Sequence, residues 1–168
     1  DLSSYAVKTA REGAPARGGL FSVSESSNLP FGEDTFDSAI SFYTLEHFPD
    51  PKKSIDEMLR VLKKGGRIII VSPAWEEPGQ FPPSLKRRMK SRLYRARYTA
   101  GRYLKYLWLC LDRTGYFFST VARPSVLDDG EYAADEDVVY IVMTREILNY
   151  FRLKGCRIII VKSPVRAY

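Results

Sequence analysis

The sequence contains few of the side chains from which metal sites and disulfides are built. Its 168 residues include two cysteines, Cys110 and Cys156, and one histidine, His47. The cysteines lie far apart, outside any CxxC pair and within apolar patterns, so buried thiols are favoured over a disulfide or a metal site. This use of cysteine is typical of a reducing cytoplasm.

An acidic run at residues 135–137 is the other candidate for a cation site. Its three carboxylates precede an apolar segment, and no further ligands converge with them in the sequence. Calcium and magnesium need several oxygen ligands, so an acidic turn in solvent is favoured and no metal is expected.

The chain also lacks a long apolar run, an internal repeat and the regions of a signal peptide. None of its apolar runs reaches the length of a membrane span. A cytoplasmic location is therefore expected, with peripheral membrane contact left open. The composition, 45% hydrophobic and 13% aromatic, suits one globular domain over residues 1–168 with a sizeable core.

Charge is unevenly distributed along this chain. The formal net charge is +6, but Lys and Arg crowd into residues 86–113, whereas residues 33–50 and 128–137 are acidic. The basic character therefore belongs to one segment and not to the whole surface.

Turn residues and apolar periodicity predict alternating helices and strands. Helices are expected from Ser3 or Ser4 to about Glu12 with Gly13 as a left-handed stop, from Pro51 to Lys64 with Asp50 as cap, from Ser84 to Leu111, and from Thr144 to about Lys154 with Gly155 as stop. Strands are expected at 21–24, 37–44, 67–72, 138–142 and 156–161.

Several of these strands are apolar throughout, which is typical of strands covered on both faces. Alternating strands and helices favour an α/β fold, a twisted sheet with helices on both faces. Ligands of such sheets bind at the carboxyl ends of the strands. The strand at 37–44 ends at one such edge, and residues 45–49 are expected to form its rim.

Four segments together resemble class I S-adenosylmethionine-dependent methyltransferases, the small-molecule, type 11-like enzymes with a Rossmann-like sheet. They are "DLSSYAVKTARE", "SESSNLPFGEDTFDSAISFYTLEHFPDP", "IDEMLRVLKKGGRIIIVSP" and, more loosely, "TREILNYFRLKGCRIIIV". The similarity runs almost continuously from Asp1 to Pro73. The resemblance implies S-adenosylmethionine as cofactor and methyl transfer to a small molecule, a lipid or a sugar.

The resemblance also implies which residues hold the cofactor. Asp1, with Leu2 beside it, matches the acid that takes both ribose hydroxyls, and a carboxylate suits two donors. Glu25 matches the acid that receives the adenine amino group, although aspartate is commoner there, and the backbone of Ser26 lies near the ring. A solvated loop carboxylate remains the alternative for Glu25.

The end of the strand at 37–44 is expected to lie beside the methionine part of the cofactor or the acceptor. Phe42 and Tyr43 are assigned to the cofactor, and Thr44 and Glu46 to the acceptor, with ordinary packing as the alternative for the aromatic rings. His47 is the candidate general base. The favoured alternative is that Glu46 and His47 shape the loop, because transfer from a sulfonium needs mainly in-line positioning in a dry site.

The glycine-rich turn that follows the family's first strand is missing from the sequence. We therefore expect an N-terminally truncated, partial domain that lacks the first strand and helix. We expect it also to lack a final antiparallel strand, which would follow Tyr168. Such a sheet exposes unpaired backbone, so an oligomer or a complementing chain is expected to complete it.

Residues 77–130 are expected to be a long basic helical insertion that resembles a lid over the acceptor pocket, with Tyr94 and Tyr98 contacting the acceptor. Three alternatives stay open for its basic helix: a core-packed helix with a solvated basic face, a helix resting on anionic lipid, and a grip on phosphates of RNA or of the acceptor. The sequence contains no recognisable nucleic-acid module, which disfavours RNA. A non-catalytic Rossmann-like module that binds an anionic membrane or an acidic partner is the alternative to the enzyme.

Overall fold

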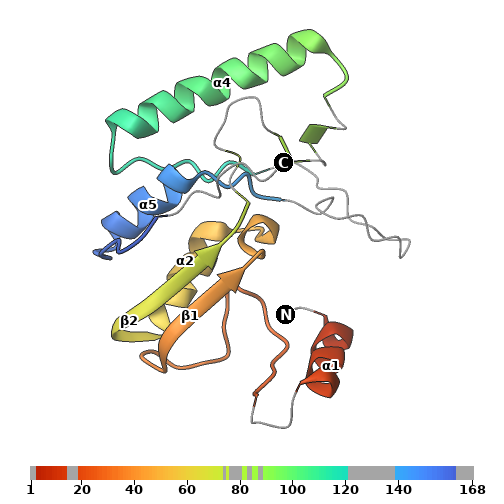
Figure 1. Cartoon of the computed structure of the whole chain (residues 1–168), viewed down its shortest axis with the longest axis vertical. Helices are drawn as coiled ribbons and strands as arrows, with labels where there is room; N and C mark the ends of the chain where they lie inside the picture. The colour runs from red at the N-terminus through yellow and green to blue at the C-terminus, as the bar shows by residue number, and fades with distance from the viewer. Residues whose placement is uncertain are drawn as a thin grey trace. The chain divides into compact units, whose positions relative to one another are not determined.

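A computed structural model describes residues 3–14, 19–73, 75, 81–82, 85–86, 89–120 and 139–161. This part of the chain is a mixed α/β structure with a small parallel sheet (Figure 1). Its elements in chain order are α1 (Ser4–Gly13), β1 (Phe36–Phe42), the 3-10 helix η1 (Leu45–His47), α2 (Pro51–Arg60), β2 (Leu62–Val71), α4 (Arg92–Leu111) and α5 (Thr144–Leu153).

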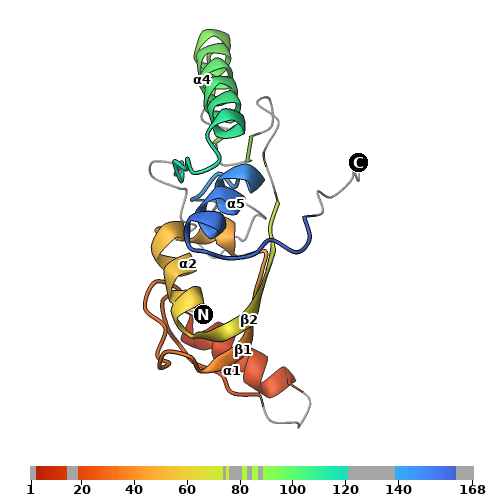
Figure 2. The same cartoon turned by 90° about the vertical axis from the view of Figure 1, so that its left-hand side faces the viewer.

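The chain divides into two compact units, which are described separately. The N-terminal unit comprises Asp1–Phe42 and Asp50–Val71, and the C-terminal unit comprises Tyr43–Pro49 and Ser72–Tyr168. Figure 2 shows the elements of both units from a second side. No helix among the described residues is both long enough and apolar enough to cross a membrane.

Helix α1 begins as the sequence predicts and ends differently. The hydroxyl of Ser3 accepts a hydrogen bond from the backbone N–H of Ala6 at 3.1 Å and so caps the first turn. Gly13 is the last helical residue, and the chain continues from Ala14 in an extended conformation. The predicted left-handed stop at Gly13 is therefore wrong, because an extended residue ends the helix.

Helix α2 is capped by Asp50, whose carboxylate accepts from the N–H of Lys53 at 2.9 Å. The helix ends at Arg60, four residues before the predicted Lys64. The reason is a competing partner for the backbone: the N–H groups of Thr35 and Phe36 both donate to the carbonyl of Val61 at 2.9 Å. This draws the chain into β2 directly after α2.

The lysine–glycine run between α2 and the apolar part of β2 is an irregularity of the sheet. Phe36 pairs with Leu62, but Ser38 pairs with Arg67, so two steps along β1 correspond to five along β2 and three residues are extra on β2. Gly65 has a φ of +80°, and a Cβ on Gly66 would lie 2.8 Å from the carbonyl oxygen of Lys63. Both glycines are therefore required by the backbone.

Beyond this irregularity β1 and β2 form a regular parallel pair in which Ile40 faces Ile69 and Phe42 faces Val71. Both strands were predicted to be buried on both faces. Instead Ile40 is 66% exposed and Phe42 64% exposed. Within the described residues each strand has only the other as a ladder partner.

The other predicted strands do not form ladders in the described part of the chain. Residues 21–24 and 156–161 have no strand conformation, and of 138–142, whose first residue lies outside the described range, the structure shows one antiparallel bridge between Thr120 and Tyr140. Helix α5 occupies nearly its predicted range, and Gly155 follows with the expected positive φ, +76°.

Helix α4 starts at Arg92, with Ser91 as its cap, instead of at Ser84. Of the preceding residues, 85–86 are helical and 89–91 are not. Only two of its side chains, Arg102 and Leu109, are buried. The alternative of a core-packed helix with a solvated basic face therefore does not describe α4, because four of its five leucines are exposed.

The core of the C-terminal unit lies on α5 and the segment before it. Tyr140, Ile141, Tyr150 and Phe151 are buried there. Glu146, also buried, accepts hydrogen bonds from the N–H groups of Phe117 and Phe118 and from the hydroxyl of Tyr140 at 2.7 Å. The amide of Asn149 donates to the carbonyls of Asp112 and Gly115 at 3.0 and 2.9 Å. Two polar side chains of α5 thus fix the segment that follows α4.

Burial raises the pKa of the Glu146 carboxyl above its usual range, although the bonds from Tyr140, Phe117 and Phe118 oppose this. A raised pKa contributes stability below the ordinary pKa, and the contribution is lost as the pH rises through the folded value. We expect the free energy of unfolding of the native protein, relative to Glu146→Gln, to fall as the pH rises above the ordinary pKa of a glutamate, about 4. Chemical denaturation of both proteins at several pH values measures this difference in the free energy of unfolding.

A Glu146→Ala variant serves as the second arm of this experiment. It leaves two backbone donors and a tyrosine hydroxyl without their acceptor, so it should be less stable than Glu146→Gln by about 3 kcal/mol, and by the same amount at every pH, because neither variant titrates at this position. A pH-independent difference between the native protein and Glu146→Gln would contradict the raised pKa.

Candidate functional site

The loop before β1 is held on α2 by an acid–base pair one helical turn apart. The carboxylate of Glu57 accepts from Nε and Nη2 of Arg60 at 2.7 and 2.8 Å and from the N–H of Leu29 at 2.9 Å. The guanidinium of Arg60 also donates to the carbonyls of Phe31 and Leu29, at 2.9 and 3.2 Å. The backbone of the "LPF" triplet is therefore bound through three of its polar groups.

The same contacts determine the ionisation of Glu57. Hydrogen bonds from Arg60 lower the pKa of Glu57 to about 2, partial burial opposes them, and the bond from Leu29 adds to the lowering. The carboxylate is therefore charged at any physiological pH. A charged, bidentate pair gives this loop a defined geometry.

The turn that carries Glu25 is attached to the first turn of α2. The hydroxyls of Ser26 and Ser54 are 2.8 Å apart, and the Ser54 hydroxyl donates to the carbonyl of Asp50 at 2.9 Å. Within the turn, the N–H of Asn28 donates to the carbonyl of Glu25 at 3.2 Å. Both turns around the "SESSNLPF" segment are thus positioned by polar side chains of α2.

The carboxylate of Glu25 is exposed, and one oxygen accepts from the hydroxyl of Ser27 at 3.3 Å. A carboxylate has about four acceptor positions, so a further donor, such as an adenine amino group, fits this side chain. The hydroxyl of Ser26 is engaged with Ser54, which agrees with the expectation that the backbone of Ser26, and not its side chain, would lie near a ligand.

The carboxyl end of β1 carries two exposed aromatic residues. Phe42, the last residue of the strand, belongs to the N-terminal unit, and Tyr43 begins the next segment of the C-terminal unit. Tyr43 has a φ of +50° and is 54% exposed. A left-handed backbone at a bulky residue costs free energy and recurs at functional sites.

Helix η1 follows and contains the Glu46–His47 pair. Glu46 is 1% exposed; its carboxylate accepts from the hydroxyl of Ser72 at 2.6 Å, and its carbonyl accepts from the N–H groups of Val139 and Tyr140 at 2.9 and 2.8 Å. His47 is partly exposed, with Nε2 4.0 Å from Oε1 of Glu46. Glu46 thus ties η1 to two other segments of its unit.

The remaining two candidates lie on α4. The rings of Tyr94 and Tyr98 have centroids 6.3 Å apart, and Tyr98 also lies 5.8 Å from the ring of Phe81. Tyr94 is exposed, whereas Tyr98 is half-buried, and its burial raises the pKa of its hydroxyl while Arg102 opposes this.

The predicted site residues fall into three groups. Asp1 and Leu2 lie outside the described residues, as does the acidic run 135–137. Glu25, Ser26 and Phe42 lie in the N-terminal unit. The C-terminal unit holds the remaining candidates, which are Tyr43, Thr44, Glu46, His47, Tyr94 and Tyr98. Their assignments to cofactor and acceptor remain predictions.

Sequence reasoning missed the two residues that position the loop, Glu57 and Arg60. A signal was present, because an acid followed three residues later by a base on a helix is a favourable pair. The spacing predicts the pair itself, but not that both members also bind the backbone of Leu29 and Phe31.

Comparison with known proteins finds a family match for the first part of the chain. Residues 1–70 match the family described as "Methyltransferase domain". This confirms the resemblance carried by the segments from Asp1 to Pro73.

Curated relatives agree with this match. The chain is 36% identical over 73 residues to 2-methyl-6-phytyl-1,4-hydroquinone methyltransferase 2 of Oryza sativa subsp. japonica, covering 44% of this chain and 21% of the relative. It is 44% identical over 50 residues to demethylmenaquinone methyltransferase of Clavibacter sepedonicus, covering 30% and 20%. Norajmaline N-methyltransferase of Rauvolfia serpentina is 37% identical over 89 residues, covering 51% and 30%. The matched segments thus span between a fifth and a third of these relatives.

The Glu57–Arg60 pair predicts a specific acid dependence. A lowered pKa contributes stability above the ordinary value, and this is lost as the pH falls toward about 2. We expect Glu57→Gln to lower the thermal midpoint by a few degrees near neutrality, and the difference from the native protein to shrink with falling pH. Calorimetry at several pH values checks this.

Glu12→Gln is the matched control, because Glu12 is exposed and its partner Lys8 is 3.9 Å away. Such a pair contributes little to stability. An equal effect of both substitutions would show that Glu57 does not hold the loop.

Proposed function

We propose that the protein containing this methyltransferase-domain segment, residues 1–70, transfers the methyl group of S-adenosylmethionine to a small organic acceptor. The observation that carries the proposal is the family match over the segment whose turns, at Glu25 and at Leu29, are fixed on α2. Hydroquinone and alkaloid methyltransferases among the relatives support a small-molecule acceptor, with lipid-like acceptors included.

The cofactor supplies a methyl group that is already activated on a sulfonium, so the protein has to bind and orient two reactants. Glu25 would accept a hydrogen bond from the adenine amino group, and Asp1, beside Leu2, would accept hydrogen bonds from the ribose hydroxyls. Phe42 and Tyr43 would contact the methionine portion. The bound cofactor would supply the methyl carbon to an attacking acceptor atom, with the electrons of the broken carbon–sulfur bond left on sulfur and the acceptor's proton released to water.

Glu46 and His47 hold the loop at the edge of this site. The support is the burial of Glu46 and its bonds to Ser72, Val139 and Tyr140. Thr44 lies at the start of the same turn, where its carbonyl accepts from the N–H of His47 at 3.1 Å. We assign His47 a positioning role, and Thr44, Tyr94 and Tyr98 the acceptor side.

We further propose a Rossmann-like sheet with helices on both faces, and a lid-like role for the inserted segment 77–130, which the structure describes only in part. The parallel β1–β2 pair with α2 between the two strands in sequence supports this architecture. The alternative of a catalytically silent module finds no support in the comparisons, because the relatives are named as methyltransferases.

Titration calorimetry with S-adenosylmethionine tests the cofactor assignment. Binding is expected, and Glu25→Gln should weaken it about tenfold, since the amide presents one acceptor oxygen and loses the charge. Glu12→Gln, an exposed acid of the same unit, should bind as the native protein does. Absence of heat up to millimolar cofactor would refute the proposed function.

Methyl transfer to the hydroquinone acceptors named for the relatives tests the role of His47. His47→Gln should retain activity within about tenfold, with an unchanged pH profile, if the ring only positions the loop. A loss of about a thousandfold, together with disappearance of an ionisation near neutrality, would identify His47 as a general base instead.

A further inference from the structure

Four of the five leucines of helix α4 point away from its own unit. Because a helix rotates about 100° per residue, Leu93, Leu104 and Leu111 point within about 20° of one direction, with Leu107 beside them. These four side chains, here called the leucine face, are 70%, 67%, 85% and 42% exposed. The two buried residues, Arg102 and Leu109, lie on roughly the opposite side of the helix.

This orientation is the reverse of an ordinary amphipathic helix, whose apolar stripe faces the core. The leucine face extends along most of α4, about 27 Å at 1.5 Å per residue. Ala96 and Ala100, both exposed, lie between its leucines. Contiguous apolar surface of this length marks an interaction site in a folded protein.

The charges on α4 indicate which kind of partner can bind to the leucine face. The helix carries five basic residues and no acidic one: Arg92, Arg95, Arg97, Arg102 and Lys105. A second copy of the chain would bring the same positive charges to the contact, and the repulsion disfavours self-association through this face. The partner that suits this face has an apolar interior and a negatively charged surface.

Aromatic side chains border the leucine face on both sides. Tyr103 lies along one edge and Trp108 along the other, at 52% and 42% exposure. The ring of Trp108 is held by Phe117, with 4.9 Å between centroids. Tyrosine and tryptophan at the edges of an apolar stripe are typical of helices that rest at the headgroup level of a bilayer.

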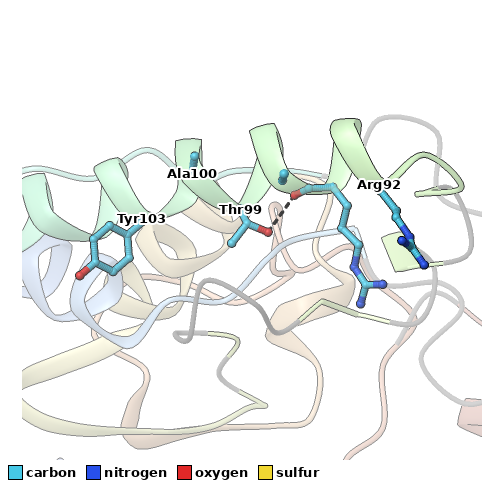
Figure 3. A pocket seen from close by; sticks show the side chains of 6 residues that line it. Arg92, Thr99, Ala100 and Tyr103 are labelled. Atoms are coloured by element: carbon cyan, nitrogen blue, oxygen red, sulfur yellow. Dashed lines mark hydrogen bonds between the residues drawn. The ribbon is translucent and has the colours of Figure 1, made fainter.

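An open hollow of about 580 Å³ lies along α4 on the Tyr103 side of the leucine face and is lined by Arg92, Arg95, Thr99 and Tyr103 among others (Figure 3). The hydroxyl of Thr99 donates to the carbonyl of Arg95 at 2.8 Å. Arg97 lies on the other side of the leucine face. Guanidinium groups on both sides are placed to bind lipid phosphates.

We propose that α4 lies in the headgroup layer of an anionic phospholipid membrane, with the leucine face toward the acyl chains and Arg92 and Arg97 on lipid phosphates. Apolar burial and attraction to anionic lipid then act together on one helix. The proposal does not depend on methyl transfer, because it concerns a surface on α4 alone. For an enzyme that methylates lipid-like acceptors, this membrane contact gives access to acceptor molecules dissolved in the bilayer.

Co-sedimentation of the full chain with phosphatidylcholine vesicles, with and without phosphatidylglycerol, tests the proposal. Binding is expected to the anionic vesicles and to weaken with added salt. Leu104→Gln with Leu111→Gln should reduce the partition coefficient at least about tenfold. Arg92→Gln with Arg97→Gln should reduce it about thirtyfold. All four side chains are exposed, so the fold is not expected to change.

Matched controls separate the helix from general charge and hydrophobicity. Leu20→Gln with Leu153→Gln removes two exposed leucines elsewhere, and Arg11→Gln with Lys64→Gln removes two exposed charges. Both control pairs should bind vesicles much as the native chain does. Circular dichroism verifies that every variant keeps its helix content.

Fluorescence of Trp108 gives a second readout. In a Trp75→Phe background Trp108 is the remaining tryptophan, and its emission should shift to shorter wavelength with anionic vesicles only. Three results would overturn the proposal: absence of binding, binding that the control pairs reduce as strongly as the α4 pairs, or a dimer in solution that Leu104→Gln with Leu111→Gln dissociates.

Discussion

The pair formed by Glu57 and Arg60 is the contact on which the N-terminal unit depends. It fixes the loop at Leu29 and Phe31 on α2, and the backbone at the end of the same helix receives Thr35 and Phe36. One helix thus supports both the loop before β1 and the first residue of the strand. A hydrogen-bonded charge pair suits this position, because its two members together satisfy three backbone groups that packing alone would leave unpaired.

The end of α2 shows how a tertiary contact outweighs local preference. Helix periodicity and the basic residues Lys63 and Lys64 predict a helix that continues to the glycines. The backbone instead leaves the helix at Val61, because the carbonyl of Val61 accepts from the N–H groups of Thr35 and of Phe36, the first residue of β1. Lys63 then pairs with Asp37 at 2.8 Å. The glycines serve the sheet irregularity, a use that a sequence signature for a helix stop cannot distinguish.

Two helix caps and one helix stop could be read from the sequence, since they depend on neighbouring residues: Ser3, Asp50 and Gly155 behave as expected. The burial of the strands could not, because it depends on which segments lie beside them. The site shows the same division. A motif indicates Glu25 and His47 as candidates, whereas the anchoring of their loops by Ser54 and Ser72 joins segments more than twenty residues apart.

The leucine face of α4 shows most clearly what the periodicity of apolar residues cannot predict, namely what an apolar side of a helix contacts. A stripe at helical spacing establishes that the helix has an apolar side, but the spacing is the same whether that side meets a core or a membrane. What separates the two cases is the opposite side of the helix. Here that side offers Tyr98, Arg102 and Leu109 to the unit, and the guanidinium of Arg102 donates to the carbonyl of Trp75. With this side packed against the unit, the leucine face of α4 is available for another partner.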